Sequence, residues 1–177
     1  MRLRWLIAIA VALIAAGPLF ALSGIYDVAA TTEHSLPVYW LLHRTTIQSV
    51  RLHSRAIEAP PLGDPARIER GLVLYRDHCA QCHGAPGTPP HPFALGLNPA
   101  ALNLAEVARS WTAPEIYWTV RHGVLLTGMP AWEARMSDND LWSIVAFIEQ
   151  LPAMSPADYR ARAERAGPVK TSDADLR

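Results

Sequence analysis

Two cysteines and a histidine fall within five consecutive residues of this chain. Cys79 and Cys82 are the only cysteines among 177 residues, and His83 follows directly after the second. Because the two thiols are only three positions apart, they exclude the disulfide framework that holds many small secreted domains together. A chain of this length is expected to form one modest core with an appendage. We therefore expect both sulfurs to bind the same group.

The segment over residues 79–83 reads Cys-Ala-Gln-Cys-His, which is the attachment motif of c-type haem. Two intervening residues let the thiols reach two neighbouring vinyl groups at the edge of one macrocycle. The histidine that follows is directed under the iron as its proximal ligand. The motif predicts one haem c, covalently attached through Cys79 and Cys82, with His83 bound to the iron.

Two other kinds of site can use this pair of thiols. A zinc site needs two further ligands at regular spacing, and the sequence offers no second ligand pair of that kind. A thioredoxin-like dithiol needs alternating strands and helices, which are absent from the pattern. Haem is favoured over both. The histidines available to a zinc site are His78, His83, His91 and His122.

A second axial ligand decides whether a haem iron carries electrons or reacts with added ligands. Met129 has a glycine before it and a proline after it, which argues against simple core packing. Met136 and Met154 are expected to fill the core. A thioether ligand raises the reduction potential relative to two imidazoles. We predict His83 and Met129 as the iron ligands. The remaining candidates, expected at the surface but able to replace Met129 under some conditions, are His91 and His122.

Helical periodicity runs through the chain, and no segment shows the alternation of a strand. The Asp-Pro pair at residues 64–65 predicts a helix that ends at Cys79. Glycine and proline are frequent in residues 84–98, which predicts an irregular loop. Capping-box spacing then marks two short helices, and a stronger helix begins at Ser137 and ends before Pro152. The predicted fold class is all-α.

The N-terminus pairs two basic residues, Arg2 and Arg4, with an apolar run over residues 5–22. This run approaches the roughly 20 residues of a membrane-spanning helix and exceeds the apolar part of most signal peptides. Ala21 and Ser23 nevertheless leave cleavage open. The excess of positive charge on the cytoplasmic side predicts that everything after Ser23 lies outside the cytoplasmic membrane.

Residues 35–58 predict a second helix with apolar side chains around much of its surface. Arg44, Arg51 and Arg55 recur at spacings that place them on one face. Such a helix can lie on anionic lipid or dock against a partner subunit, and it can equally be a connector whose charged face is solvated. Residues 59–63 form a short, proline-rich linker after it.

The overall charge argues against one large class of partners. Basic and acidic residues are equal in number, so the formal net charge is zero. Nucleic-acid binding needs a basic surface that neutralises phosphates. We expect no nucleic-acid partner.

Residues 68–151, roughly half of the chain, resemble class I cytochromes c of the small, bacterial, membrane-associated type. The resemblance implies a compact haem domain of three to five helices, in which the first and last helices cross at Gly71 near Phe147. The positions that carry it are Gly71, Leu74, Tyr75, Cys79, Cys82, His83, Gly84, Gly123, Thr127, Gly128, Met129, Pro130, Trp132, Trp142 and Phe147.

The same resemblance implies contacts around the haem. A proline carbonyl after the haem motif is expected to accept a hydrogen bond from the second ring nitrogen of His83 and so fix the ring. Trp118 and Arg121 are candidates for contact with the haem propionates, with Arg121 as a charged donor. A core tryptophan and a solvated arginine are the alternative. The candidate prolines are Pro86, Pro89 and Pro90.

These predictions divide the chain into four parts. Residues 1–23 form a membrane anchor or signal sequence, residues 24–63 an amphipathic docking helix with its linker, and residues 64–152 the monohaem domain. Residues 153–177 form a polar tail, in which a weak helix over residues 156–166 is possible.

The predicted function is electron transfer by a membrane-anchored cytochrome c that faces the periplasm. Its donor is expected to be a dehydrogenase or a quinol-oxidising complex, and its acceptor a terminal oxidase or a soluble carrier. No small-molecule substrate is expected, and the chain is not expected to be an enzyme in its own right. Two alternatives stay open: a fixed subunit of a larger membrane oxidoreductase, and peroxidase or gas-sensing chemistry at an open haem.

Overall fold

The computed structural model describes residues 2–167, and the regular elements in that range are helical, which confirms the expected all-α class. They fall into two compact units, and the boundary along the chain lies after Glu33. In chain order the elements are α1 (Arg2–Leu22), α2 (Leu36–Ser54), α3 (Pro65–His78), α4 (Ala80–His83), the 3-10 turn η1 (Pro92–Gly96), α5 (Leu104–Ser110), α6 (Ala113–His122), α7 (Asp138–Ile148), the 3-10 turn η2 (Leu151–Ala153) and α8 (Pro156–Arg165).

The first unit consists of α1 and the chain that follows it. α1 has 21 residues and no buried side chain. At 1.5 Å per residue it is about 30 Å long, which matches the hydrocarbon thickness of a bilayer. By length and composition, α1 is able to cross a membrane.

The helices of the second unit begin where their capping residues predict. The Asp64 side chain caps α3. Thr112 and Glu115 form a capping box at the start of α6. The Ser137 hydroxyl accepts a hydrogen bond from the N–H of Asp140 at 3.2 Å and starts α7. These side chains satisfy backbone donors that have no partner within the helix, so each helix start is set by local sequence.

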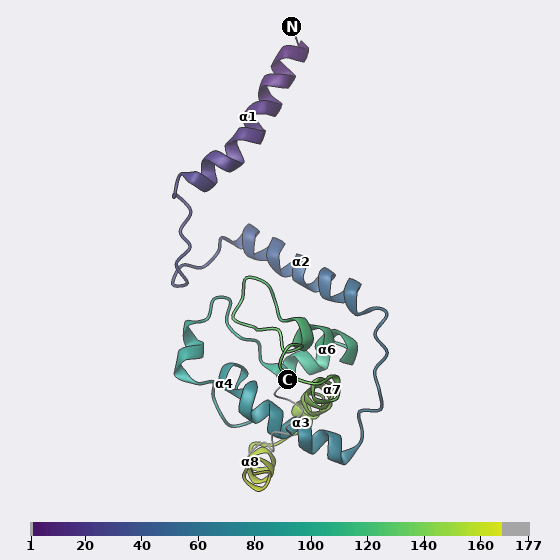
Figure 1. Ribbon diagram of the computed structural model, residues 1–177. Helices are drawn as coiled ribbons and strands as arrows, with labels where there is room; N and C mark the ends of the chain where they lie inside the picture. Colours follow the sequence, from purple (N-terminus) through teal and green to yellow (C-terminus); the bar gives the residue numbers. More distant parts are fainter. Residues whose placement is uncertain (1, 168–177) are drawn as a thin grey trace. The chain divides into compact units, whose positions relative to one another are not determined.

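The core of the second unit is the crossing of α3 and α7 (Figure 1). Gly71 makes this crossing possible, because a Cβ at that position would lie 1.8 Å from the carbonyl oxygen of Ser143 and 2.9 Å from the Cβ of Phe147. The Tyr75 and Phe147 rings pack one turn further along, with centroids 5.1 Å apart. The crossing implied by the cytochrome resemblance is confirmed.

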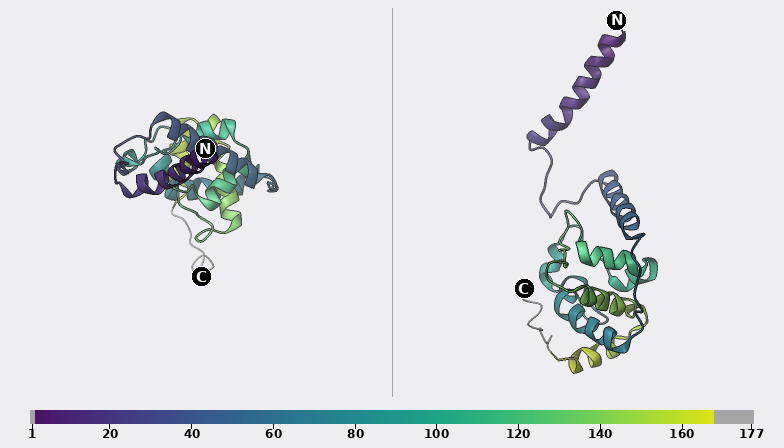
Figure 2. Two further views of the ribbon diagram at one scale, coloured as in Figure 1. Left: turned by 90° about the horizontal axis from the view of Figure 1, so that it is seen from above. Right: turned by 45° about the vertical axis from the view of Figure 1, so that its right-hand side comes forward.

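α8 packs on the far side of α3, so that α3 and α7 lie between α6 and α8 (Figure 2). Tyr159 is buried in the core, and Arg162 pairs with Glu69 at 2.7 Å. Arg76 donates hydrogen bonds to the carbonyl of Ala163 at 3.0 Å and to that of Gly167 at 2.7 Å. The weak helix expected over residues 156–166 is therefore part of the core. Residues 168–177 of the expected tail lie outside the described residues.

α2 corresponds to the helix expected over residues 35–58, and its C-terminal half packs on α6. Val50 is almost fully buried there. Arg51 pairs with Glu115 at 3.6 Å, and the His53 ring stacks on Trp118 with centroids 5.4 Å apart. These contacts join α2, which lies wholly within the second unit, to α6.

Candidate haem site

The two cysteines lie on one tight turn at the end of α3. Cys79 is the C-cap of α3, and its carbonyl accepts hydrogen bonds from the N–H groups of Cys82 at 3.1 Å and His83 at 3.0 Å. Gly84, with φ of 68°, ends the short helix α4. The two thiols are not bonded to each other. Burial, assisted by the nearby Cys82, raises the pKa of the Cys79 thiol to about 12.

His83 is held by a backbone carbonyl from a distant part of the chain. Its Nδ1 lies 2.7 Å from the carbonyl oxygen of Leu102, which can only accept, so Nδ1 carries the proton and donates it. Nε2 is then the nitrogen with a free lone pair, as a metal ligand requires. Burial lowers the pKa of His83 below its usual value, although the bond to Leu102 opposes this shift. The ring is therefore neutral at neutral pH.

The acceptor for His83 corrects an expectation from the sequence. Pro86, Pro89 and Pro90 were the expected sources of the carbonyl, and none of them supplies it. Two backbone hydrogen bonds between Ala85 and Thr88 close a tight turn directly after α4, and this turn contains the first part of the loop. The chain returns to His83 only just before α5, at Leu102.

Met129 lies half-buried on the loop between α6 and α7, against the hydrophobic core. Its carbonyl accepts a hydrogen bond from the N–H of Val124 at 3.2 Å, which closes the loop. The Thr127 hydroxyl donates to the Val124 carbonyl at 2.7 Å and accepts from the N–H of Met129 at 3.1 Å. The backbone on either side of Met129 is therefore fixed by its own loop.

Two contacts join the Met129 loop to the segments around the cysteine motif. The Trp132 ring packs against His78, the residue before Cys79, with centroids 5.3 Å apart. A Cβ on Gly128 would lie 2.7 Å from the side chain of Leu97, which follows η1. Neither contact could be predicted from spacing, because Trp132, Gly128 and Leu97 lie in loops without periodic structure.

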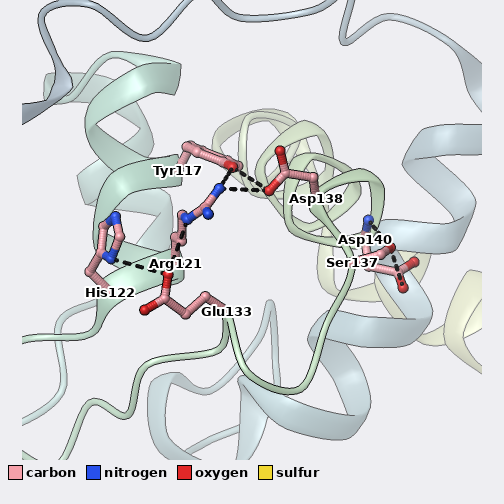
Figure 3. A network of polar contacts seen from close by, with 7 residues as sticks. All are labelled: Tyr117, Arg121, His122, Glu133, Ser137, Asp138 and Asp140. Carbon is pink, nitrogen blue, oxygen red and sulfur yellow. Dashed lines mark hydrogen bonds and ion pairs between the residues drawn. The ribbon is translucent and has the colours of Figure 1, made fainter. Parts of the chain in front are cut away.

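Arg121 links the Met129 loop to α6 and α7 (Figure 3). Its guanidinium donates to the Asp138 carboxylate and the Tyr117 hydroxyl, both at 2.8 Å, and reaches Glu133 at 3.3 Å. Its backbone carbonyl accepts from the N–H groups of Trp132 and Glu133. The end of α6, the start of α7 and the Met129 loop thus meet at one side chain. A contact between Arg121 and a haem propionate stays a prediction.

Trp118 lies between two histidine rings. Its ring stacks on His53 of α2 and packs against His122 at a centroid distance of 5.1 Å. Both neighbours are on the side of α6 that faces α2. A propionate contact for Trp118 likewise stays a prediction.

The histidines that were candidates for a zinc site are engaged separately. His91 starts η1 and accepts from the N–H of Phe93, His122 lies 3.6 Å from Glu133, and His78 packs on Trp132. Within residues 2–167, no three side chains of the metal-binding types are grouped closely enough to hold an ion. The arrangement gives the zinc alternative no support.

Comparison with known proteins identifies the segment that holds this site. Residues 66–148 match the family model described as cytochrome C oxidase, cbb3-type, subunit III. This is a cytochrome c domain. It is similar to a quinohemoprotein alcohol dehydrogenase of Comamonas testosteroni (30% identity over 86 residues, 49% of this chain and 11% of that protein). It is also similar to the cbb3-type cytochrome c oxidase subunit CcoP of Cereibacter sphaeroides (31% identity over 88 residues, 50% of this chain and 29% of that protein). The matches thus span less than a third of either relative.

The cytochrome c family implies a haem c cofactor, and the residues of this domain fit it. Cys79 and Cys82 present two unpaired thiols on one turn, at the spacing that haem attachment uses. His83 has its Nδ1 fixed and its Nε2 available. Met129 supplies a thioether on a loop that contacts both flanks of the motif. This set of sulfur and nitrogen donors is what a haem with His and Met ligands needs.

Gly123 allows the backbone of the Met129 loop to take its observed path, and substitution of Gly123 tests this role. Its φ is 66°, and a Cβ would lie 2.7 Å from the Met129 carbonyl oxygen and from the backbone of Pro130 and Ala131. We expect Gly123→Ala to lower the free energy of unfolding by roughly 1–3 kcal/mol, measured by urea denaturation. Gly96→Ala is the matched control, since nothing lies within 4 Å of a Cβ there. Equal stability of the two variants would contradict the expectation.

Proposed function

We propose that this chain is a membrane-anchored monohaem cytochrome c that transfers electrons between proteins. One haem c is attached through Cys79 and Cys82, with His83 and Met129 as the axial ligands of its iron. The observation that carries the proposal is the state of His83. Its Nδ1 is bound to the Leu102 carbonyl at 2.7 Å, which leaves Nε2 as the ligand nitrogen, directly beside two unpaired thiols.

Haem c, when bound, supplies an iron that changes its charge by one electron. The residues of the chain hold that group rigid. The Leu102 carbonyl orients the His83 ring and increases its basicity. Thr127 fixes the backbone of Met129, and the contact between Trp132 and His78 holds the Met129 loop against the motif. A site with both axial positions filled by such fixed ligands suits electron transfer and has no open position for a substrate.

The location we propose is the outer face of the cytoplasmic membrane, with the cytochrome domain in the periplasm. α1 is apolar enough to serve as the anchor, and Arg2 and Arg4 precede it. Positive residues are retained on the cytoplasmic side, so the rest of the chain is placed outside. In this arrangement residues 1–23 anchor the chain, residues 24–63 connect and dock, and residues 64–152 carry the haem.

A second candidate function is that of a fixed subunit in a larger membrane oxidoreductase. One relative is named as a subunit of a cbb3-type cytochrome c oxidase, and the other as a quinohemoprotein alcohol dehydrogenase. In each, the similar segment is a minor part of the whole protein. Purification in detergent separates the two candidates: a monodisperse monomer supports the free carrier, and co-purification with fixed partners supports the subunit.

Intact-mass measurement tests the cofactor. We expect the purified chain to exceed its sequence mass by one haem, because there is a single attachment motif. The reduced protein is expected to show the visible spectrum of a six-coordinate haem c. The intact mass also reports whether the N-terminal segment is retained. A protein without bound haem, or with a haem that acidic organic solvent extracts, would contradict covalent attachment.

A matched pair of variants assigns the attachment to the two thiols. Cys82→Ser removes one thioether, so the remaining haem should keep one free vinyl group and show a red-shifted absorption band. Cys79→Ser combined with Cys82→Ser should abolish covalent haem. Retention of covalent haem in the double variant would overturn the assignment.

A further inference from the structure

The N-terminal half of α2 continues the packing face of its C-terminal half but is largely exposed, and of residues 36–42 only Val38 is partly buried. Apolar and small residues, together with His43, recur along one stripe of α2 at alternating spacings of four and three. In the second half, Val50 and Ser54 of this stripe are buried against α6. In the first half, Leu36 is 83% exposed and Trp40 is 61% exposed. The stripe therefore extends beyond the domain that covers its other end. Its residues are Leu36, Trp40, His43, Ile47, Val50 and Ser54.

The exposed half is apolar on every side. Residues 36–42 read Leu-Pro-Val-Tyr-Trp-Leu-Leu, and they contain no charged side chain. Leu41 and Leu42, which lie on other sides of the helix from Trp40, are also more than 40% exposed. A single partner helix would cover one stripe and leave the other faces in water. A helix end that is apolar all round instead fits an environment that surrounds it.

The charges beside this apolar end have one sign. The sequence has no acidic residue between Glu33 and Glu58. Arg44 follows Trp40 by one turn and is exposed, whereas Arg51 is paired with Glu115 of the domain. An arginine just beyond an apolar segment that includes Tyr39 and Trp40 is typical of helices at a membrane surface. The aromatic rings then lie at the level of the headgroups, and the arginine contacts lipid phosphate.

From these observations we propose that the N-terminal end of α2, residues 36–42, inserts into the surface of an anionic membrane. This inference rests on the membrane anchoring proposed above. The segment is about 10 Å long, so inserted end first it reaches about 10 Å, a depth similar to that at which the apolar faces of interfacial helices are buried. Only residues 23–35 separate α1 from α2, and an extended chain of that length reaches at most about 45 Å. A membrane that holds α1 is therefore within reach of α2.

The consequence of insertion is a fixed orientation for the cytochrome domain. The second half of α2 is joined to α6 by Val50, by the pair of Arg51 with Glu115 and by the His53 ring on Trp118. Because α2 is one continuous helix, insertion of its first half sets the direction of α6 relative to the bilayer. A domain tethered by α1 alone would rotate freely.

Cysteine accessibility in a bilayer tests the proposal. Leu36→Cys reports the inserted end, and Gln48→Cys, an exposed position on the same helix, is the matched control. Each full-length holoprotein is reconstituted in nanodiscs that contain phosphatidylglycerol and is treated with a water-soluble polyethylene glycol maleimide. The reaction at position 36 is expected to be about tenfold or more slower than at position 48, the factor that corresponds to burial of one leucine-sized side chain. Equal rates in these nanodiscs would overturn the proposal.

Further experiments identify what covers residues 36–42 and distinguish a failure of this proposal from a failure of membrane anchoring by α1. Arg44→Glu in the Leu36→Cys protein is expected to raise the rate about fivefold or more in anionic nanodiscs. An unchanged rate would contradict the role of anionic lipid. Protection of position 36 in native membranes but not in lipid-only nanodiscs would show that a protein covers it and would overturn the lipid proposal. A protein that fails to enter nanodiscs contradicts the anchor as well, whereas one that enters with position 36 reactive contradicts only the role of α2.

Discussion

The reduced Met129→Ala protein is expected to bind carbon monoxide stoichiometrically at neutral pH, whereas the unchanged protein is expected to bind little. Removal of the thioether leaves His83 as the only side chain assigned to the iron, and a vacant axial position takes up added ligands. The weak absorption band of thioether-bound ferric haem, near the red edge of the visible spectrum, should disappear. The reduction potential should fall, because a thioether stabilises the reduced iron. Visible spectroscopy and a redox titration measure all three effects.

Met136→Ala is the matched control for this experiment. Met136 is also half-buried and packs against the same core, so its loss removes a similar apolar volume. We expect the control to keep the thioether band and to lose only stability. A result in which Met136→Ala loses the band while Met129→Ala keeps it would reverse the assignment. Rapid carbon monoxide binding by the unchanged protein would instead favour peroxidase or sensor chemistry.

The largest effect on stability is expected from Gly71→Ala. A Cβ at Gly71 would lie 1.8 Å from the Ser143 carbonyl oxygen, which is backbone and cannot move without separating α3 from α7. Overpacking in a core typically lowers the free energy of unfolding by about 1–3 kcal/mol, and we expect this close backbone contact to cost about 3 kcal/mol. Urea denaturation followed by far-UV circular dichroism measures the loss. If the variant does not fold, its failure to accumulate with bound haem reports the same effect.

Gly63→Ala is the control for that substitution. Gly63 lies just before α3, and nothing is within 4 Å of a Cβ built there. Its replacement is expected to change the free energy of unfolding by no more than about 0.5 kcal/mol. If Gly71→Ala proved as stable as Gly63→Ala, the close crossing of α3 and α7 would be wrong.

Features that depend on neighbouring residues could be predicted from the sequence. The caps at Asp64, Thr112 and Ser137 bond to groups within three residues, so spacing alone locates the helix starts. The haem motif is equally local, because Cys79 and His83 belong to one turn. The crossing at Gly71 could be predicted only through the resemblance to cytochromes c, since one glycine in a helical pattern does not name its partner.

Features that depend on the path of loops could not be predicted. The acceptor for His83 is a backbone carbonyl, and every residue has one, so no side chain marks Leu102. The contact of Trp132 with His78 joins residues whose separation in sequence carries no period. The sequence predicts Arg121 as a solvated charge or a propionate ligand. Its three side-chain partners could not be predicted, because they come from α6, α7 and the Met129 loop, and only the fold brings them together.

The main partners of α3 are synthesised long after α3 itself. Arg70 pairs with Asp140, 70 residues later, and Glu69 pairs with Arg162, 93 residues later. While the chain is emerging, Cys79 therefore has no completed core around it and is open to chemical modification. Once α7 and α8 have docked, only 8% of Cys79 is exposed. For the proposed attachment of haem through Cys79, the order of the helices along the chain therefore predicts that the reaction precedes the docking of α7 and α8.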